Sequence, residues 1–451
     1  MAKRISAPAS GRVAEGMLML LVLAALLFGG GAQGRGDAVV HVIAAACLVL
    51  GLVRMQAASL DAAPRRLLWW TAAAVCCVGL QLLPLPAGVW SAIGPRAALA
   101  ADLAAAGQSV GWRPMTVDSV ATLRGLMALL VFASAASLAM TLDDAARRRV
   151  IAVMLLAGVA MAFLGFAQAA AGQHSSLRFY GYHHPIGAIG TFANRNHFAS
   201  LLGMLAPLAL LFAVRTPRRA VSLAWYAAAL ALVLASALSY SRAGFALTLA
   251  ATTAAALVPH WPAPGASRGR AWLAPLAFVF AVGIAVAYYA WAGLMQRIGI
   301  DPLSDLRWQY LRYGREVLMH WLPWGSGAGT FPWVYAPAEP IAAMTSTYAA
   351  RAHNDVLQVL IELGVPGAVL MLAFAALLLV KPARKIPIRD DAANAHHRVS
   401  IVTGVAIWVP LLHSLVDYPL RTLAVATVLA VLLATQLAAH RSGNPHAAVA
   451  G

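Results

Sequence analysis

The residues from Arg351 to Gly367 place a histidine directly before a helix start, and this combination can support acid–base chemistry. They read Arg-Ala-His-Asn-Asp-Val-Leu-Gln-Val-Leu-Ile-Glu-Leu-Gly-Val-Pro-Gly. Asn354 or Asp355 can cap the helix that follows, which leaves His353 just outside its first turn. Free backbone amides and the positive end of the helix dipole disfavour a charged imidazole there. We therefore expect a neutral His353 that can act as a general base.

The same stretch carries a family resemblance. His353-Asn354, nine further residues and then Gly364-x-x-Gly367 resemble the periplasmic signature of the bacterial O-antigen ligase and polysaccharide polymerase superfamily. Its members act on undecaprenyl-diphosphate-linked glycans, and the resemblance implies that His353 is catalytic and Asn354 supports it. Without that pattern, a histidine in this position is more often an interfacial hydrogen-bonding residue. The Gln-Leu-x-Pro-Leu-Pro sequence that begins at Gln81 also resembles the superfamily.

Three arginines are candidates for binding a diphosphate. Arg242 follows Tyr240-Ser241 at the outer end of a short connection, where a cation is costly without an anionic partner. The ordinary explanation of Arg242 is that its side chain contacts lipid headgroups. The ordinary explanation of Arg307 is that it lies on a solvated helix face. The resemblance implies instead that Arg242 and Arg307 form the diphosphate-binding pair. Arg195 is a third candidate, also in a motif resembling the family's, although a helix cap with a headgroup contact explains it equally well.

Six further residues are expected to support the base and the cations, among them Asn354, named above. Asn194 and Asn196 flank Arg195, and Arg312 follows Arg307 in the same loop. His413 and Asp417 are one helical turn apart at the outer membrane boundary, where they can orient an arginine or a sugar hydroxyl. A structural polar contact between helices is an equally good explanation of this last pair.

Composition excludes an ordinary soluble domain. The chain has 451 residues, of which 61% are hydrophobic and 11% are charged, and its mean hydropathy is +0.75. The formal charge of +17 is compatible with a nucleic-acid partner. However, the basic residues are dispersed between apolar runs, and the sequence contains no recognisable nucleic-acid-binding module. The three cysteines lie within apolar runs, so no disulfide framework is expected.

The apolar runs predict an all-α polytopic membrane protein with about twelve transmembrane helices in one integral membrane domain. The family resemblance implies that this fold is similar to that of GT-C glycosyltransferases. Gly364, Pro366 and Gly367 predict a kink or a close helix contact about three turns into the helix that follows His353. The expected spans are 15–33, 38–55, 67–83, 119–140, 149–171, 196–214, 221–238, 243–259, 272–293, 355–380, 399–416 and 420–439.

Basic clusters alternate with these spans, as expected when the N-terminus and C-terminus are cytoplasmic. The first span follows Lys3, Arg4 and Arg12 without a small-residue cleavage site, so we expect a retained helix. The cytoplasmic loops would then include Arg147-Arg148-Arg149 and the stretch from Lys381 to Arg398. We expect the bacterial inner membrane as the location, with an active site that faces the periplasm.

Three outer segments lie between the spans. Residues 81–118 are too interrupted by proline for a span and are expected along the membrane surface. Residues 172–195 form a periplasmic loop, and residues 294–352 form a large periplasmic loop that is rich in Trp and Arg. We expect one or two short helices in the large loop, foremost over 306–319, because a long aromatic-rich loop is seldom disordered. The tail, residues 441–451, is expected to be disordered.

Two other chemistries lack the residues they need. A metal site would need clustered acids or a His-Glu-x-x-His spacing, and the histidines have neither, so we expect no metal and no cofactor. No Gly-x-Ser-x-Gly context supports a serine nucleophile.

The resemblance implies a metal-independent, inverting glycosyltransferase that moves an undecaprenyl-diphosphate-linked O-antigen to lipid A-core. The expected partners are this donor, the lipid A-core acceptor and membrane lipids, without nucleic acid. Polymerisation of the lipid-linked glycan is the close alternative, and protein O-glycosylation is a third. A polysaccharide flippase is the alternative from another class, but it would need more ionisable residues near the bilayer centre.

Overall fold

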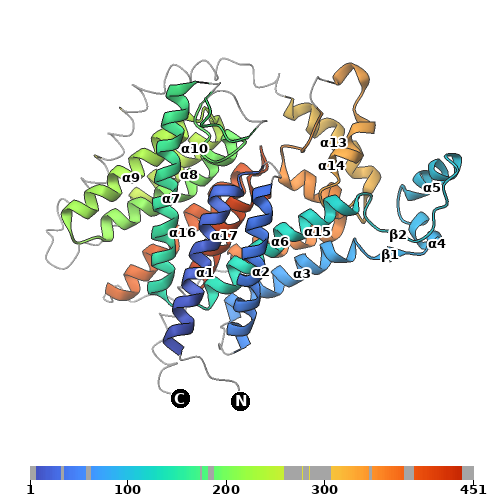
Figure 1. Ribbon diagram of the computed structural model, residues 1–451. Coiled ribbons are helices and arrows are strands. Elements are labelled where there is room, and N and C mark those ends of the chain that lie inside the picture. Colours follow the sequence, from blue (N-terminus) through green and yellow to red (C-terminus); the bar gives the residue numbers. More distant parts are fainter. Residues whose placement is uncertain are drawn as a thin grey trace.

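The computed structural model describes residues 7–31, 35–56, 62–172, 175–180, 187–258, 277, 284, 306–344, 348–379 and 391–438. This part of the chain is almost entirely helical (Figure 1). The helices are α1 Ala7–Phe28, α2 Arg35–Gln56, α3 Ala62–Leu80, α4 Ala87–Ser91, α5 Arg96–Ala105, α6 Ser119–Met140, α7 Asp144–Ala171, α8 Arg195–Arg215, α9 Arg219–Leu238, α10 Arg242–Leu257, α13 Arg307–Trp321, α14 Phe331–Tyr335, α15 Asp355–Leu379, α16 Asp391–His413 and α17 Leu423–Ala438. The short elements are β1 Pro84–Leu85, β2 Arg113–Pro114 and the 3₁₀ turns η2 Ala336–Ala338, η3 Ile341–Ala343 and η4 Pro419–Arg421.

The all-α polytopic membrane fold is confirmed. Within the described residues, seven helices are long and apolar enough to cross a membrane, namely α1, α2, α6, α7, α8, α9 and α15. Shorter apolar helices form in α10, α16 and α17. Each expected span in this part of the chain coincides with a helix, while the expected span at 272–293 and the tail at 441–451 fall outside the described residues.

Helix α8 is the centre of the bundle, because 83% of its apolar span is buried, more than in the other long helices described. It packs against α9, α10 and α16. Small residues permit these close contacts: a Cβ at Gly203 would come within 2.8 Å of Thr248 and of Val409. Close backbone approach at small residues is how helices associate where lipid supplies no hydrophobic driving force.

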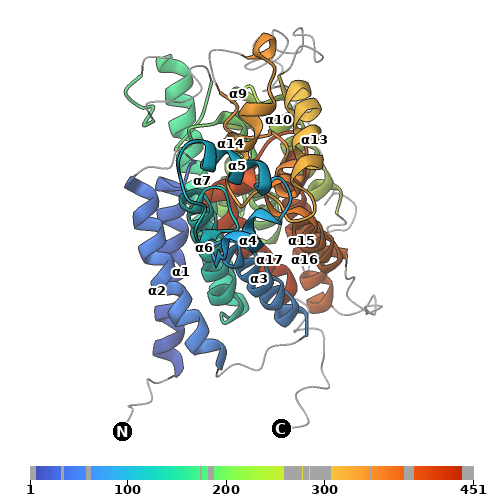
Figure 2. The same ribbon diagram turned by 90° about the vertical axis from the view of Figure 1, so that its right-hand side faces the viewer.

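Helix α1 begins and α2 ends at one end of the bundle (Figures 1 and 2), and arginines with polar partners are found on the elements that meet there. Arg54 Nε donates to Thr141 Oγ1 at 3.1 Å, and Arg149 pairs with Glu15 of α1 at 2.5 Å. Further arginines at this end are Arg147, Arg148, Arg215 and Arg398. The basic clusters expected on one side of the membrane therefore meet at one end of the fold.

The opposite end carries α13 and α14, which have a small core of their own. Tyr310, Val317 and Trp321 of α13 pack with Phe331 of α14 and with Ile361 of α15. The helix expected over 306–319 is confirmed by α13, and α14 is a second short helix in the same loop. This packing fixes the first residue of α13 beside the start of α15.

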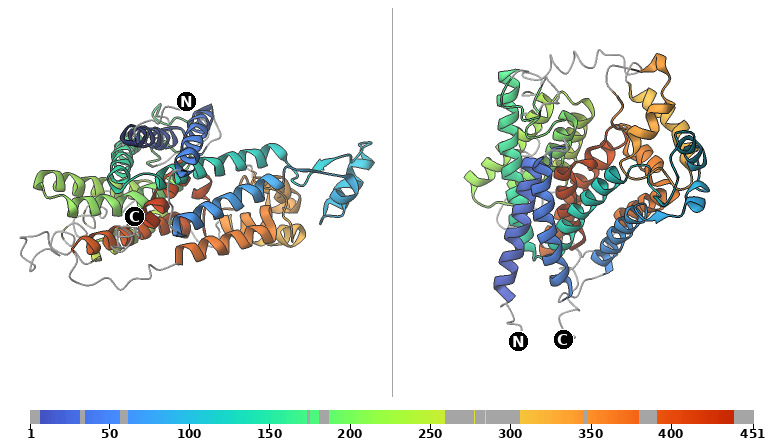
Figure 3. Two further views of the ribbon diagram at one scale, coloured as in Figure 1. Left: turned by 90° about the horizontal axis from the view of Figure 1, so that it is seen from below. Right: turned by 45° about the vertical axis from the view of Figure 1, so that its right-hand side comes forward.

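Residues 81–118 extend beyond the helices of the bundle (Figure 3). The segment contains α4, α5 and the antiparallel pair of β1 and β2, and α5 has only ten residues, too few to cross a bilayer. The buried Arg96 holds this segment to α13 and its following turn. Its guanidinium donates to Met115 O and Gly325 O and lies 5.2 Å from the Trp321 ring centroid.

The expected kink in α15 is present at Gly364, which has φ +58° and ψ −142°. Val365 N donates to Pro323 O at 2.8 Å and not to the carbonyl one turn earlier, and Pro366 has no N–H to donate. The two carbonyls released in this way accept from the neighbouring glycine turn: Ser326 N donates to Ile361 O and Gly327 N to Glu362 O. The kink therefore joins α15 to the loop after α13 by backbone hydrogen bonds.

Candidate active site

The buried carboxylate of Asp417 joins residues from three other parts of the chain. Asp417 follows the end of α16 and is 0% exposed. Its Oδ1 lies 3.4 Å from His353 Nδ1 and 3.6 Å from His197 Nε2. Its Oδ2 lies 3.6 Å from Arg307 and accepts a short hydrogen bond from Asn196 Nδ2. One anion thus gathers the starts of α8 and α13 and the loop before α15.

The charge of Asp417 is maintained by these neighbours. Burial alone raises the pKa of Asp417, but the imidazoles of His197 and His353 outweigh burial and hold that pKa well below its usual range. Asp417 therefore stays ionised near neutral pH. An ionised carboxylate favours positive or hydrogen-bonding partners, which Arg307 and Asn196 supply.

His353 is held in an unusual backbone conformation. Its φ is +50°, one of two positive φ values among the described non-glycine residues, and the other is +55° at Tyr240. The expected cap is confirmed, because Asn354 Oδ1 accepts from Leu357 N at 2.9 Å. The imidazole stacks on Tyr310 at 5.7 Å between centroids and meets Tyr418 edge-on at 4.9 Å. A non-glycine residue in this region costs roughly 1 kcal/mol or more and persists only where its surroundings impose it.

The three candidate arginines each occupy the first position of a helix. Arg195 begins α8, Arg242 begins α10 and Arg307 begins α13. Arg195 is buried, whereas the Arg307 side chain is 35% exposed although it pairs with Asp417. Ser241 Oγ caps α10 by accepting from Gly244 N, and a Cβ at Gly244 would lie 3.2 Å from His413. These contacts place the start of α10 against α8 and the end of α16.

The supporting candidates take different positions. Asn194 caps α8 by accepting from Asn196 N at 2.8 Å. His413 bonds Ser200 Oγ through Nδ1 at 2.6 Å, so its described hydrogen bond is a contact between helices. Arg312 lies over the Tyr313 ring at 5.7 Å, and none of its described contacts joins it to Asp417.

A second charged cluster lies behind His353, and sequence reasoning missed its cation, Arg421. Arg421 Nε donates to Asp355 Oδ1 at 2.9 Å, and Nη1 donates to Glu362 Oε2 at 3.0 Å. Glu362 also accepts from Gln358 Nε2 at 2.7 Å, and Asp355 from Ser414 Oγ at 2.8 Å. Burial lowers the pKa of Arg421, but the two carboxylates outweigh it and raise that pKa. The position of Arg421, four residues after Asp417 at an outer helix end, was the available signal.

Arg351 adds another cation at the same place. Burial lowers the pKa of Arg351, and the nearby charge of Arg421 lowers it further, while Glu362 acts in the opposite direction. The loop before α15 therefore brings both His353 and a second guanidinium to the site.

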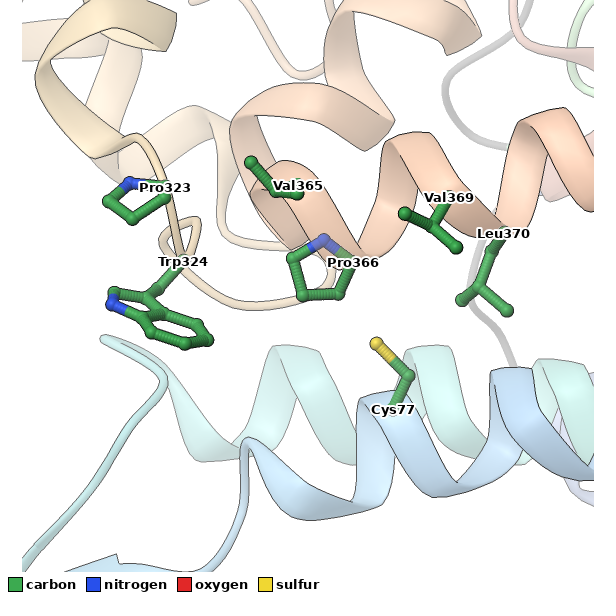
Figure 4. A pocket seen from close by; sticks show the side chains of 7 residues that line it. All are labelled: Cys77, Pro323, Trp324, Val365, Pro366, Val369 and Leu370. Carbon is green, nitrogen blue, oxygen red and sulfur yellow. The ribbon is translucent and has the colours of Figure 1, made fainter.

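An apolar pocket of about 450 Å³ lies beside the kink in α15 (Figure 4). Cys77 of α3 and Trp324 face Pro366 across it, and Val369 and Leu370 continue its wall. Pro366 is eleven residues beyond Asp355, which corresponds to roughly 16 Å along a helix. The lining suits hydrocarbon and offers nothing to a sugar or a phosphate.

The described residues contain no group of three or more His, Cys, Asp or Glu side chains arranged to hold a metal ion. Two histidines lie beside Asp417, but the other contacts of this carboxylate are with Arg307, a cationic donor, and Asn196, a neutral donor. This donor set suits an anion and a hydroxyl better than a divalent cation.

One comparison with known proteins finds a related family. Residues 186–372 match the family model described as O-Antigen ligase. This range contains Arg195, Arg242, Arg307 and His353, while Asp417 lies beyond it. No curated protein matches the chain in sequence. The match supports the resemblance of this multi-pass membrane chain to the O-antigen ligase and polymerase superfamily, whose members act in general as ligase- or polymerase-type enzymes on lipid-linked glycans.

Proposed function

We propose that this protein transfers an undecaprenyl-diphosphate-linked O-antigen to lipid A-core on the periplasmic side of the bacterial inner membrane. The observation that carries the proposal is the meeting of His353 and Arg307 at the buried carboxylate of Asp417. A base and a diphosphate-binding cation are the two groups that such a transfer needs, and here one anion positions both.

The starts of α8, α10 and α13 form the donor site. Each presents the positive end of a helix dipole and an arginine at its first position. Guanidinium groups bind phosphate oxygens in pairs and keep their charge, which suits a diphosphate. As the bond between the sugar and the diphosphate breaks, these cations stabilise the negative charge that develops on the leaving oxygen.

His353 acts as the general base. Its Nδ1 faces Asp417, so Nε2 is the nitrogen available to an acceptor hydroxyl. The hydroxyl oxygen attacks the anomeric carbon, its proton passes to His353, and undecaprenyl diphosphate departs with the bonding electrons. A single displacement of this kind inverts the anomeric configuration. Asp417 stabilises the imidazolium that forms, in the way that a carboxylate supports the histidine of a hydrolase triad.

The apolar pocket beside the kink supports a lipid-linked donor. It lies on the wall of α15, the helix that begins at the proposed chemistry, and its lining accepts only hydrocarbon. An isoprenoid chain that leaves the diphosphate and follows α15 toward the membrane interior would reach this pocket.

Polymerisation remains the nearest alternative, because the same base and cations would activate a hydroxyl on a second lipid-linked glycan. Protein O-glycosylation differs only in the acceptor. A flippase is less well supported: Glu362, the ionisable group farthest into α15, is buried and neutralised by Arg421. A carboxylate fixed in this way is a poor carrier of coupled protons.

The test is a transfer reaction with purified protein, undecaprenyl-diphosphate-linked labelled glycan and lipid A-core. We expect label on lipid A-core, with inverted anomeric configuration and no effect of EDTA. Lengthening of the donor without labelled lipid A-core would assign polymerase activity. Failure of both products, with donor binding intact, would contradict the proposal.

A further inference from the structure

A second site lies at the other end of the bundle, among α7, α8, α16 and α17. It is a pocket of about 340 Å³. Asn196 and Arg215 mark opposite ends of α8 and are nineteen residues apart, which corresponds to about 28 Å. The pocket is therefore separate from the candidate active site.

Positive charge is concentrated around this pocket. Arg147 is buried and satisfied, since it pairs with Asp144 at 2.5 Å and donates to Ala139 O at 3.3 Å. Arg148 and Arg215 bring two further guanidinium groups, and Arg398 is close enough to act on Arg215 electrostatically. Guanidinium groups in a pocket wall favour an anionic ligand such as a phosphate.

A buried hydroxyl in the pocket wall gives an independent indication of a ligand. Thr403 is 0% exposed, and its Oγ1 is buried without a hydrogen-bond partner among the described residues. A buried hydroxyl without a partner is destabilising, so an unfilled hydrogen bond in a pocket wall indicates a polar group that the pocket receives.

The rest of the wall is hydrocarbon. Ile151, Leu208, Leu211 and Phe212 line the pocket opposite the polar groups. A free phosphate would leave these side chains without a partner, whereas a phospholipid offers both a phosphate and an acyl chain.

We propose that this pocket binds the phosphate head group of an anionic membrane phospholipid, with Arg148 and Arg215 contacting the phosphate, Thr403 donating a hydrogen bond, and the apolar wall holding the start of an acyl chain. The basic loops that line it are those expected to face the cytoplasm. Binding there would attach the ends of α7, α8 and α16 to one lipid molecule.

Native mass spectrometry of the purified full-length protein tests the proposal, with phosphatidylglycerol or phosphatidylcholine as the added lipid. We expect retention of phosphatidylglycerol alone. Arg148→Gln combined with Arg215→Gln should weaken retention by roughly 30-fold, from about a factor of five for each arginine near a lipid phosphate. The matched control, Arg218→Gln with Arg219→Gln, removes the same charge from adjacent positions outside the pocket and should change retention by less than about threefold.

A second pair of variants keeps charge constant and protects the test against misfolding. Thr403→Val should weaken phosphatidylglycerol retention by about fivefold through one lost hydrogen bond. Thr427→Val is its control, because Thr427 is also 0% exposed with an unpartnered hydroxyl but does not line the pocket. The proposal would be overturned by equal retention of phosphatidylcholine or by equal losses in variant and control. It would also be overturned if inorganic phosphate at about 10 mM, added as a competing soluble ligand, displaced the lipid. The last result would assign a soluble phosphate to the pocket.

Discussion

At the residue scale, the site depends on one buried anion with several partners. Asp417 is 0% exposed, yet it contacts His353, His197, Asn196 and Arg307. Burying a carboxylate is costly unless its oxygens are paired and hydrogen-bonded, and these side chains supply that compensation. The same contacts orient an imidazole and a guanidinium toward one place. The residues that compensate the buried charge of Asp417 are therefore also the ones that it positions.

The pKa of Asp417 leads to a prediction for stability. Because that pKa in the folded protein lies well below the usual 3.8, the unfolded chain binds the proton more readily. The charged carboxylate therefore contributes to the free energy of unfolding above about pH 4. This contribution is lost as the pH falls through the pKa of Asp417 in the folded protein. We expect the difference in melting temperature between the wild type and Asp417→Asn to shrink from pH 5 to pH 3. Asp102→Asn, an exposed control on α5, should show no such trend, and a constant difference for Asp417→Asn would refute the assignment.

A second residue-scale prediction concerns Arg242. Arg242→Lys keeps the charge but loses the paired N–H geometry that a diphosphate accepts, so most of the transfer activity should disappear and donor binding should weaken. Arg315→Lys, on the exposed face of α13, is the matched control and should retain activity. If both variants had near-normal turnover, Arg242 would be a headgroup anchor.

At the scale of elements, helix starts organise the site. Tyr240 and His353 have positive φ, and each is followed by a capping residue, Ser241 or Asn354, and then by the first helical residue. This arrangement turns the chain sharply as it enters α10 and α15. The residue before each cap is thereby held beside the positive end of the helix dipole, where anionic ligands bind.

The kink in α15 gives an element-scale prediction. At Gly364 any side chain would be strained at φ +58° and would collide with Pro323 O. Gly364→Ala should therefore lower the stability by roughly 1–3 kcal/mol and lower the transfer rate, because the loop after α13 is bonded to the kink. Gly79→Ala in α3, where nothing lies within 4 Å, is the control and should leave melting temperature and activity unchanged. Equal effects of both substitutions would show that the kink is unimportant.

Sequence reasoning found most elements because apolar runs, caps and breakers act locally. The runs predicted the helices, Asn354 the cap of α15, and Gly364 with Pro366 the kink. The partners of Asp417 could not be found in this way. Asn196 and Asp417 are 221 residues apart, and only packing of α8 against α16 brings them together. Arg421 was missed for the same reason, since its carboxylates lie in another helix.

At the scale of the whole molecule, the two ends of the bundle differ in character. One end gathers arginines near the start of α1 and the end of α2, and the other holds α13, α14 and the cluster around Asp417 (Figure 2). Lysine and arginine concentrate on the cytoplasmic side of bacterial membrane proteins. This asymmetry supports a periplasmic position for the candidate active site.

Single cysteines in a cysteine-free background test this orientation. Ser109→Cys, in the exposed segment after α5, should react with a membrane-impermeant maleimide in intact spheroplasts. Ser400→Cys, in α16 next to Val399 of the pocket that Arg148 and Arg215 line, should react only after permeabilisation. Labelling of Ser400→Cys in intact spheroplasts, with Ser109→Cys protected, would reverse the orientation.

The most direct test of the central claim is the transfer rate of His353→Ala, measured in parallel with its binding of the undecaprenyl-diphosphate-linked donor. If His353 is the base, the rate should fall by about 10²- to 10⁴-fold while donor affinity stays close to that of the wild type, because cations hold the diphosphate. His320→Ala, an exposed histidine at the end of α13, should match the wild type in both measurements. Full transfer by folded His353→Ala protein would remove His353 from the mechanism and contradict the account.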